Sequence, residues 1–167
     1  MGKIVSLFLL FACCCCWGKP APIIDDADDL TARSWLVADA DDKILGGKNT
    51  GDVRSIASIT KIFTVLTVMA AKQPLDRYLK YKNTMVTRQD LIMLSLIHSD
   101  NHASDQLCKN YDGGFNKCIE DMNTNAKAWG MPNTTLVDAT GLGSGNTSTA
   151  EDLLKLLHLA EKNYLIV

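Results

Sequence analysis

The chain has 167 residues, 47% of them hydrophobic, and a formal net charge of −2 at pH 7. This length and apolar content suit one globular domain with a hydrophobic core. The charge gives no electrostatic basis for binding nucleic acid. Only 22% of the residues are charged, with no long run of one sign, which excludes global disorder.

The first 24 residues have the pattern of a targeting segment. Lys3 supplies a positive charge, and residues 4–12 form an apolar stretch of signal-peptide length that is short for a membrane span. We predict a signal peptide or lipoprotein signal over residues 1–24, with a membrane anchor as the alternative. Residues 10–13 resemble a bacterial lipobox, in which Cys13 is lipidated, and simple cleavage is the alternative there. The expected location is the periplasm or the outer face of the cytoplasmic membrane.

Four of the six cysteines lie within this segment, and the other two, Cys108 and Cys118, lie beyond it. In an exported protein they are candidates for a disulfide. Two buried free thiols are the alternative, because the sequence does not give the Cα separation that a disulfide requires.

The predicted elements begin after an acidic, proline-containing linker at residues 25–33. Residues 34–38 and a segment starting at residue 44 read as two strands of a hairpin. Residues 74–84 are interpreted as a connecting segment. The domain is predicted to span residues 34–167.

Helices are predicted after the hairpin. The apolar run at residues 62–71 carries a polar stripe, Thr60, Thr64 and Thr67, at helical spacing. Further helices are expected at residues 91–97, 103–109, 115–129 and 152–162, and a tight loop at residues 140–143. Capping boxes are predicted for Thr87 with Asp90 and for Ser148 with Glu151. The fold class is therefore α+β, with only two early strands, followed by helices.

Ser58 and Lys61 open the first of these helices. Residues at i and i+3 share one helix face, so the hydroxyl and the amine can share a proton. A serine becomes a good nucleophile only beside such a base. The spacing alone is common, but a second motif follows in a loop between helices, where Ser99 and Asn101 flank an aspartate.

These two motifs in this order are shared by class A β-lactamases and penicillin-binding proteins. Residues 54–61 resemble the nucleophile segment of the D-alanyl-D-alanine carboxypeptidases, the low-molecular-weight penicillin-binding proteins. Residues 94–103 resemble their second motif, and the similarity runs from about residue 32 to residue 167. The resemblance implies a β-lactamase/transpeptidase-like fold, with a helical subdomain and an incomplete antiparallel sheet.

The resemblance also implies a serine peptidase that forms an acyl-enzyme on D-Ala-D-Ala bonds of peptidoglycan stem peptides. Ser58 is then the nucleophile, Lys61 the general base, and Ser99 the group that passes a proton to the leaving D-alanine. Asn101 is expected to bind the substrate backbone. No cofactor is implied, and β-lactam antibiotics are the expected inhibitors. The alternative is that Ser99 and Asn101 merely cap the next helix.

The family's third motif, Lys-Thr-Gly or Lys-Ser-Gly, does not follow Asn101 in this sequence. Residues 48–51 look similar but precede Ser58 and carry an extra residue, so we interpret them as the exit of a strand. The segment between Lys61 and Ser99 is also shorter than is usual in the family. Three hypotheses follow: a second polypeptide supplies the missing strands, the protein binds peptide without turnover, or it cleaves with a reduced site.

Other classes remain as alternatives. A class A β-lactamase needs a deacylating glutamate, for which Glu120 and Glu151 are the candidates, although both are predicted to be helical. A non-catalytic peptidoglycan- or penicillin-binding lipoprotein is the alternative outside enzymes. His98 and His102 have the spacing of a zinc helix, but we interpret them as part of a solvated loop and expect no metal. A Ser-His-Asp triad with His98 or His158 has no further support.

Overall fold

The computed structural model describes residues 30–39, 41, 43–163 and 166. The signal-peptide and lipidation predictions, Cys13 included, and most of the predicted linker fall outside this part of the chain. Residues 32–167 form one compact unit. Within the described ranges, no helix has the length and apolar character needed to cross a membrane.

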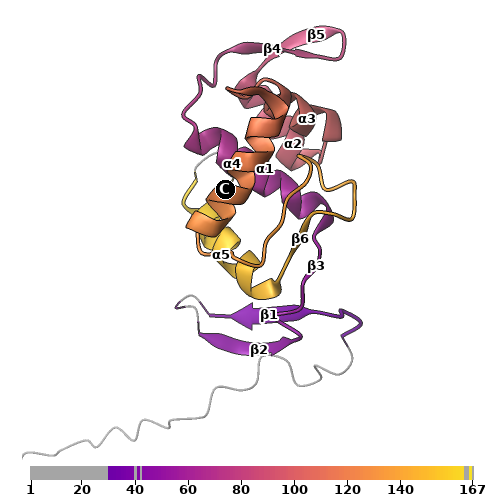
Figure 1. The fold of residues 1–167 in the computed structure, drawn as a ribbon, viewed down its shortest axis with the longest axis vertical. Helices are drawn as coiled ribbons and strands as arrows, with labels where there is room; N and C mark the ends of the chain where they lie inside the picture. The colour runs from indigo at the N-terminus through magenta and orange to yellow at the C-terminus, as the bar shows by residue number, and fades with distance from the viewer. Residues whose placement is uncertain (1–29, 40, 42, 164–165, 167) are drawn as a thin grey trace, which may run out of the picture. The chain divides into compact units, whose positions relative to one another are not determined.

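Helix α1 (Thr60–Ala70) is the element around which the other helices pack (Figure 1). It contacts all four of them, and its Phe63 and Val65 are fully buried in the core. The other helices are α2 (Arg88–Ile97), α3 (Asn101–Lys109), α4 (Gly114–Ala128) and α5 (Ala150–Glu161). The helices predicted from periodicity are thus confirmed, with boundaries that differ by a few residues.

The polar stripe of α1 is buried rather than solvated. Thr60, Thr64 and Thr67 are all fully inaccessible to solvent. The Thr64 hydroxyl donates to the Ala139 carbonyl at 2.9 Å, and the Asn125 amide of α4 donates to the Thr67 hydroxyl at 3.4 Å. Buried hydroxyls usually have partners, and Thr64 and Thr67 fasten α1 to the loop before residue 140 and to α4. The buried Thr60 hydroxyl has no hydrogen-bond partner among the described residues.

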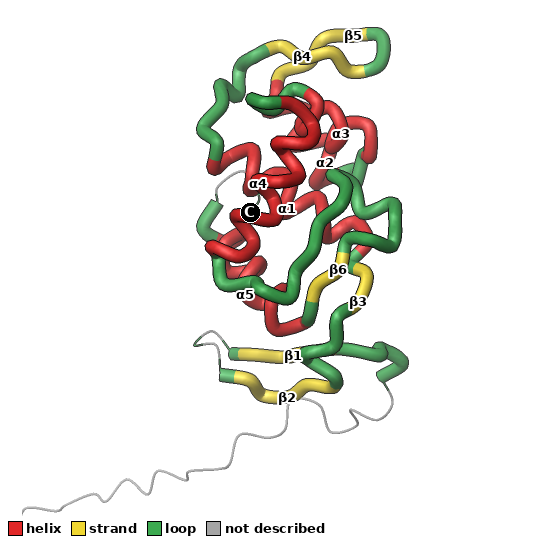
Figure 2. Tube along the Cα trace, viewed as in Figure 1, coloured by secondary structure: helices red, strands yellow, loops and turns green. Residues whose placement is uncertain are grey.

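In the described part of the chain, three small antiparallel sheets accompany the helices (Figure 2). Strand β1 (Trp35–Ala38) pairs with β2 (Ile44–Lys48), which confirms the predicted hairpin. Strand β3 (Arg54–Ser55) pairs with β6 (Thr147–Ser148) and ties the approach to Ser58 to the approach to α5. The α+β class is confirmed, although the prediction of only two strands is wrong.

The third sheet corrects the prediction of a plain connector at residues 74–84. Strand β4 (Tyr78–Tyr81) and strand β5 (Thr84–Thr87) form a hairpin through the two-residue turn at residues 82–83. Side chains alternate between exposed and buried along β4, where Leu79 is 3% exposed and Tyr78 is 66% exposed. This period of two is the strand signal, but a run of four residues is short enough to be overlooked.

The two predicted capping boxes had different outcomes. At α2 the box is present, because the Asp90 N–H donates to the Thr87 hydroxyl and the Thr87 N–H donates to Asp90. At α5 the prediction is displaced by one residue: Thr149 is the N-cap and accepts the Asp152 N–H. The reason is that Ser148 is used in β6.

Cys108 of α3 and Cys118 of α4 form a disulfide with a Cα–Cα distance of 5.3 Å. Both cysteines are fully buried. The sequence left a disulfide and two free thiols as alternatives, and the structure has the disulfide. It joins α3, which begins with Asn101, to α4.

Candidate active site

Ser58 and Lys61 meet at the start of α1. Ser58 lies in the short 3-10 helix η2 (Ala57–Ile59), and Lys61 lies in the first turn of α1. The Lys61 Nζ lies 3.0 Å from the Ser58 Oγ, within hydrogen-bond distance. Lys61 is 2% exposed, whereas Ser58 is exposed. A solvent-exposed serine hydroxyl therefore lies within hydrogen-bond distance of a buried lysine amine.

The turn that presents Ser58 is held in an unusual backbone conformation. Ala57 has a φ of 44°, which an L-residue rarely adopts. Such conformations cost free energy and persist only where neighbouring structure holds them. Gly141 supplies that neighbour: a Cβ built on it would lie 1.7 Å from the Ala57 carbonyl oxygen. The loop containing Gly141 is thus packed tightly against the nucleophile turn.

This loop also binds Lys61, a contact that the sequence prediction missed. The Lys61 amine donates to the Thr140 carbonyl at 2.7 Å. Asp138 shapes the loop, because one of its carboxylate oxygens accepts the N–H groups of Thr140 and Gly141, both at 2.7 Å. An aspartate that accepts backbone N–H groups two and three residues on is a known turn former. Asp138, two residues before Thr140, could therefore have predicted this turn from the sequence.

The electrostatics of the site shift Lys61 toward its neutral form. Burial lowers the pKa of Lys61 below its ordinary value, against the opposing influence of the Asp138 and Asp100 carboxylates. For Asp138, burial alone would raise the pKa, but the hydrogen bonds from Thr140 and Gly141 outweigh it and lower the pKa. Asp138 is therefore ionised. A lysine with a lowered pKa is the kind of base that can activate a serine.

The second motif lies between α2 and α3. Asp100, not Ser99 or Asn101, is the N-cap of α3 and accepts the Ala103 N–H at 2.8 Å. The alternative in which Ser99 and Asn101 cap this helix is therefore wrong. Both of these residues are exposed, and among the described residues neither side chain has a hydrogen-bond partner. Their polar groups are available to a bound molecule.

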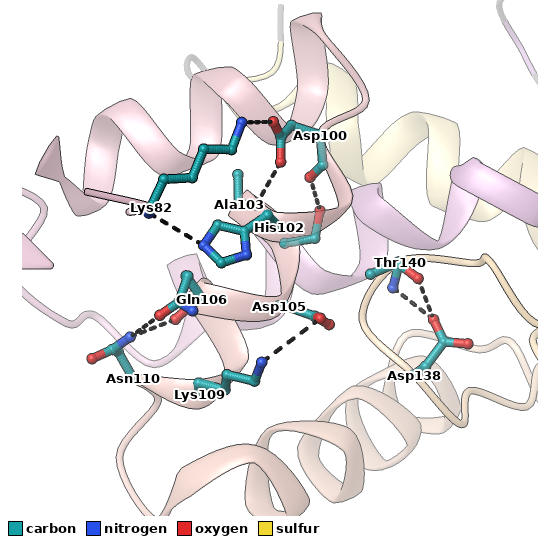
Figure 3. Close-up of polar contacts among 11 residues, drawn as sticks. Lys82, Asp100, His102, Ala103, Asp105, Gln106, Lys109, Asn110, Asp138 and Thr140 are labelled. Atoms are coloured by element: carbon teal, nitrogen blue, oxygen red, sulfur yellow. Dashed lines mark hydrogen bonds and ion pairs between the residues drawn. The ribbon is translucent and has the colours of Figure 1, made fainter. Parts of the chain in front are cut away.

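A pocket of about 430 Å³ opens beside Asn101. Asn101 and Asp105 of α3 line it together with Asp138 and Thr140 of the loop. Figure 3 shows Asp105 on one side of this region and Asp138 and Thr140 on the other. Thr140 connects the pocket to Lys61, so the structure brings Ser58, Lys61 and Asn101 to one region. Ser99 lies two residues from Asn101 but makes no hydrogen bond to Ser58 or Lys61 in the described structure.

The residues named in the rival hypotheses lie elsewhere. Glu120 is an exposed residue of α4 that pairs with Lys117, and Glu151 is an exposed residue of α5 that accepts a hydrogen bond from Thr50. Neither lines the pocket, so the geometry gives the β-lactamase alternative no support.

The histidines do not form a second centre. The described part of the chain holds no group of three or more His, Cys, Asp or Glu residues suited to a metal. The His102 ring accepts the Lys82 N–H, His98 lines a pocket along α2, and His158 lies 3.6 Å from Glu161 on α5. The partner of the Ser58 hydroxyl is Lys61.

An exposed serine within hydrogen-bond distance of a buried lysine, on a mixed α+β fold, is the arrangement that serine acyltransferases and hydrolases use. The sequence model of the D-alanyl-D-alanine carboxypeptidase family matches residues 21–82 and 75–166. The chain belongs to this family. The family resemblance inferred from the sequence is thereby confirmed.

Individual relatives agree. The D-alanyl-D-alanine endopeptidase of Escherichia coli is 35% identical over 156 residues, which cover 83% of this chain and 50% of that protein. The endopeptidase of Pseudomonas aeruginosa is 37% identical over 153 residues, which cover 81% and 49%. The chain spans about half the length of these curated relatives.

A solved structure has the same fold. Penicillin-binding protein D2 of Listeria monocytogenes, in its ampicillin-bound form, is 27% identical with a TM-score of 0.73. The match covers 80% of this chain and 63% of that one. The similarity confirms the penicillin-binding-protein fold that the resemblance implied.

Proposed function

We propose that this chain carries the nucleophile and base of a serine-type D-Ala-D-Ala carboxypeptidase that acts on peptidoglycan stem peptides. The observation that carries the proposal is the 3.0 Å contact between the exposed Ser58 hydroxyl and the buried Lys61 amine. Family membership supports the substrate class, as do the relatives named D-alanyl-D-alanine endopeptidase.

The proposed reaction begins with proton transfer. The neutral Lys61 amine accepts the Ser58 proton while the serine oxygen bonds to the carbonyl carbon of the scissile peptide bond. Collapse of the tetrahedral intermediate breaks the C–N bond, and the leaving amine takes a proton that Ser99 passes on. Water then hydrolyses the resulting ester by the reverse proton movements. Asn101 binds the peptide backbone from the pocket side.

A β-lactam enters the same sequence of steps but does not leave. Ring opening breaks the lactam C–N bond, while the amine remains attached to the acyl group and blocks the approach of water. The similarity to penicillin-binding protein D2, solved with ampicillin and with cefotaxime, supports β-lactams as inhibitors.

Covalent labelling with a fluorescent penicillin tests this proposal. The wild-type chain should be labelled, and Ser58→Ala should abolish the label because the acylated oxygen is gone. Ser55→Ala, at an exposed serine three residues earlier in β3, is the matched control and should be labelled normally. Labelling that survives Ser58→Ala would remove Ser58 from the mechanism. No label on any variant would favour the non-catalytic binding protein.

Cleavage products separate the related activities. A carboxypeptidase releases free D-alanine from a stem pentapeptide, whereas an endopeptidase cuts cross-linked stems without releasing it.

For the location, we propose the periplasm or the outer face of the cytoplasmic membrane, with lipid anchoring at Cys13. The same fluorescent penicillin, made membrane-impermeant and applied to intact cells, tests this location. The Cys108–Cys118 disulfide supports an oxidising compartment.

We also propose that a second polypeptide completes the sheet formed by β1 and β2. Among the described residues these strands pair only with each other, and a two-stranded sheet is marginal unless further strands or a packed helix cover it. Helix α5 contacts β1 but leaves part of its apolar face open. An apolar pocket of about 240 Å³ lies between β1 and α5, with Leu157 52% exposed beside it. Its lining is Leu36, Ala150, Leu153, Leu154 and Leu157. An extended segment that pairs with a free strand edge is a common mode of binding.

Thermal unfolding tests this proposal. We expect the isolated chain to melt below the usual range of about 45–65 °C, because its sheet is incomplete. Adding the recombinant half of the Escherichia coli endopeptidase that this chain does not match should raise the melting temperature. Leu157→Asp should prevent the increase. Cooperative unfolding of the isolated chain well above 65 °C, or no response to the added half, would contradict the proposal.

A further inference from the structure

The β4–β5 hairpin contacts the second motif directly. The Tyr81 hydroxyl, at the end of β4, donates to the Asp100 Oδ2 at 2.7 Å. The Lys82 Nζ lies 3.6 Å from the same oxygen, and the Lys82 N–H donates to His102 (Figure 3). The Tyr81 ring also lies 5.4 Å from the His102 ring. The hairpin therefore holds the start of α3 through side chains on two consecutive residues.

Both carboxylate oxygens and both backbone polar groups of Asp100 form hydrogen bonds. Its Oδ1 accepts the Ala103 N–H at 2.8 Å, and its Oδ2 accepts the Tyr81 hydroxyl. Its backbone carbonyl accepts the Ser104 hydroxyl, and its backbone N–H donates to the Leu94 carbonyl. With both carboxylate oxygens engaged, Asp100 has a holding role rather than a role toward a substrate.

The residue before Asp100 needs such holding. Ser99 has a φ of 51°, a left-handed conformation that is costly for a serine and persists only where the surroundings impose it. The Ser99 side chain has no hydrogen-bond partner of its own in the described structure. Since the conformation is not fixed by Ser99 itself, the contacts of Asp100 are the ones that can fix it.

We propose that Tyr81 is a positioning residue for the second motif. Its hydroxyl holds Asp100, and Asp100 holds the Ser99 hydroxyl and the Asn101 amide on either side of it. Lys82, 60% exposed in its side chain, adds only a screened contribution to the same carboxylate. The inference rests on the proposed acyl-enzyme function, for which Ser99 and Asn101 must face the acylated serine.

The test compares Tyr81→Phe with Tyr78→Phe in the full chain. Both remove one hydroxyl from β4, but Tyr78 is 66% exposed, and its hydroxyl has no hydrogen-bond partner among the described residues. Acylation is measured over a range of fluorescent-penicillin concentrations, which separates the acylation rate constant from the dissociation constant. Tyr81→Phe should lower the rate constant about tenfold or more, in line with a lost hydrogen bond to a charged group. The dissociation constant should change little, and Tyr78→Phe should match wild type.

A second comparison shows whether Tyr81 acts through Asp100. In an Asp100→Ala background, Tyr81→Phe should have no further effect on the acylation rate, because the group that it holds is already absent. Fully additive losses, or an unchanged rate in Tyr81→Phe alone, would overturn the inference.

Amide hydrogen exchange gives a readout that needs no activity. The Ala103 amide should exchange several-fold faster in Tyr81→Phe than in wild type or Tyr78→Phe, because a loosened Asp100 is a weaker cap. If the wild type is not labelled by penicillin at all, the proposed function fails, and Ala103 exchange decides the positioning role by itself. Unchanged exchange at Ala103 would then reject it.

Discussion

Lys61→Met should lower the rate of acylation by penicillin by about 100- to 10,000-fold, the usual contribution of a positioned general base. Methionine fills nearly the same buried space as lysine but cannot accept the Ser58 proton. The contact that is lost joins the Lys61 Nζ to the Ser58 Oγ at 3.0 Å. Stopped-flow or gel-based labelling measures the effect, and acylation at the wild-type rate would refute the role of Lys61 as base.

The pH dependence gives the same prediction an independent check. Burial lowers the Lys61 pKa below its ordinary 10.5, although Asp138 and Asp100 act in the opposite direction. Acylation should therefore increase with pH as Lys61 loses its proton, with a midpoint below 10.5. Lys61→Met should lack this midpoint.

The free energy of unfolding should also depend on the protonation of Lys61. Between the lowered pKa of Lys61 and 10.5, the unfolded chain binds the proton more readily than the folded chain does. The free energy of unfolding should therefore rise with pH across this window. Methionine does not titrate, so the variant should lose this pH dependence and remain folded at neutral pH, as circular dichroism can verify.

Gly141→Ala is expected to have the largest effect away from the reacting atoms. A Cβ there would lie 1.7 Å from the Ala57 oxygen and 2.8 Å from the Thr60 hydroxyl oxygen. The loop must then withdraw from the nucleophile turn and take the Thr140 carbonyl away from Lys61. Together with the left-handed φ of 77°, this should cost about 2–5 kcal/mol of unfolding free energy. Acylation should fall strongly even where the variant is folded.

Gly130→Ala is the matched control for this substitution. Gly130 also has a left-handed φ, 83°, but a Cβ there would meet only the Lys155 side chain, at 3.7 Å. It should therefore cost only the backbone term, about 1–2 kcal/mol, and should leave acylation intact. Denaturant unfolding measures both variants. Equal losses of stability and equal acylation would show that the contact between Gly141 and Ala57 is unimportant.

Local features were predictable because they depend on near neighbours in the chain. The i, i+3 spacing places Ser58 and Lys61 on one face of a helix wherever that helix forms. The Thr87–Asp90 capping box likewise closes within three residues. The displaced cap at Thr149 shows the limit, because Ser148 is drawn into a strand by Arg54, far away in the sequence.

The pattern of hydroxyls on α1 shows a second limit. Thr60, Thr64 and Thr67 indicated a helix, and a helix is present. Their spacing does not reveal what they face. The partners, the Ala139 carbonyl and the Asn125 amide, come from segments about 60 to 75 residues away. Burial of a polar stripe becomes visible only when those segments are placed.

The sequence by itself determined the helices and the first hairpin, which follow from periodicity, and the contact between Ser58 and Lys61, which follows from their spacing within one turn. Only the tertiary structure decided what surrounds that pair. The Thr140 carbonyl on Lys61, the close approach of Gly141 to Ala57 and the hold of Tyr81 on Asp100 join segments separated by 19 to 84 residues. Such contacts form because loops, strands and helices pack against one another, and no local pattern encodes which distant group will lie beside Lys61, Ala57 or Asp100.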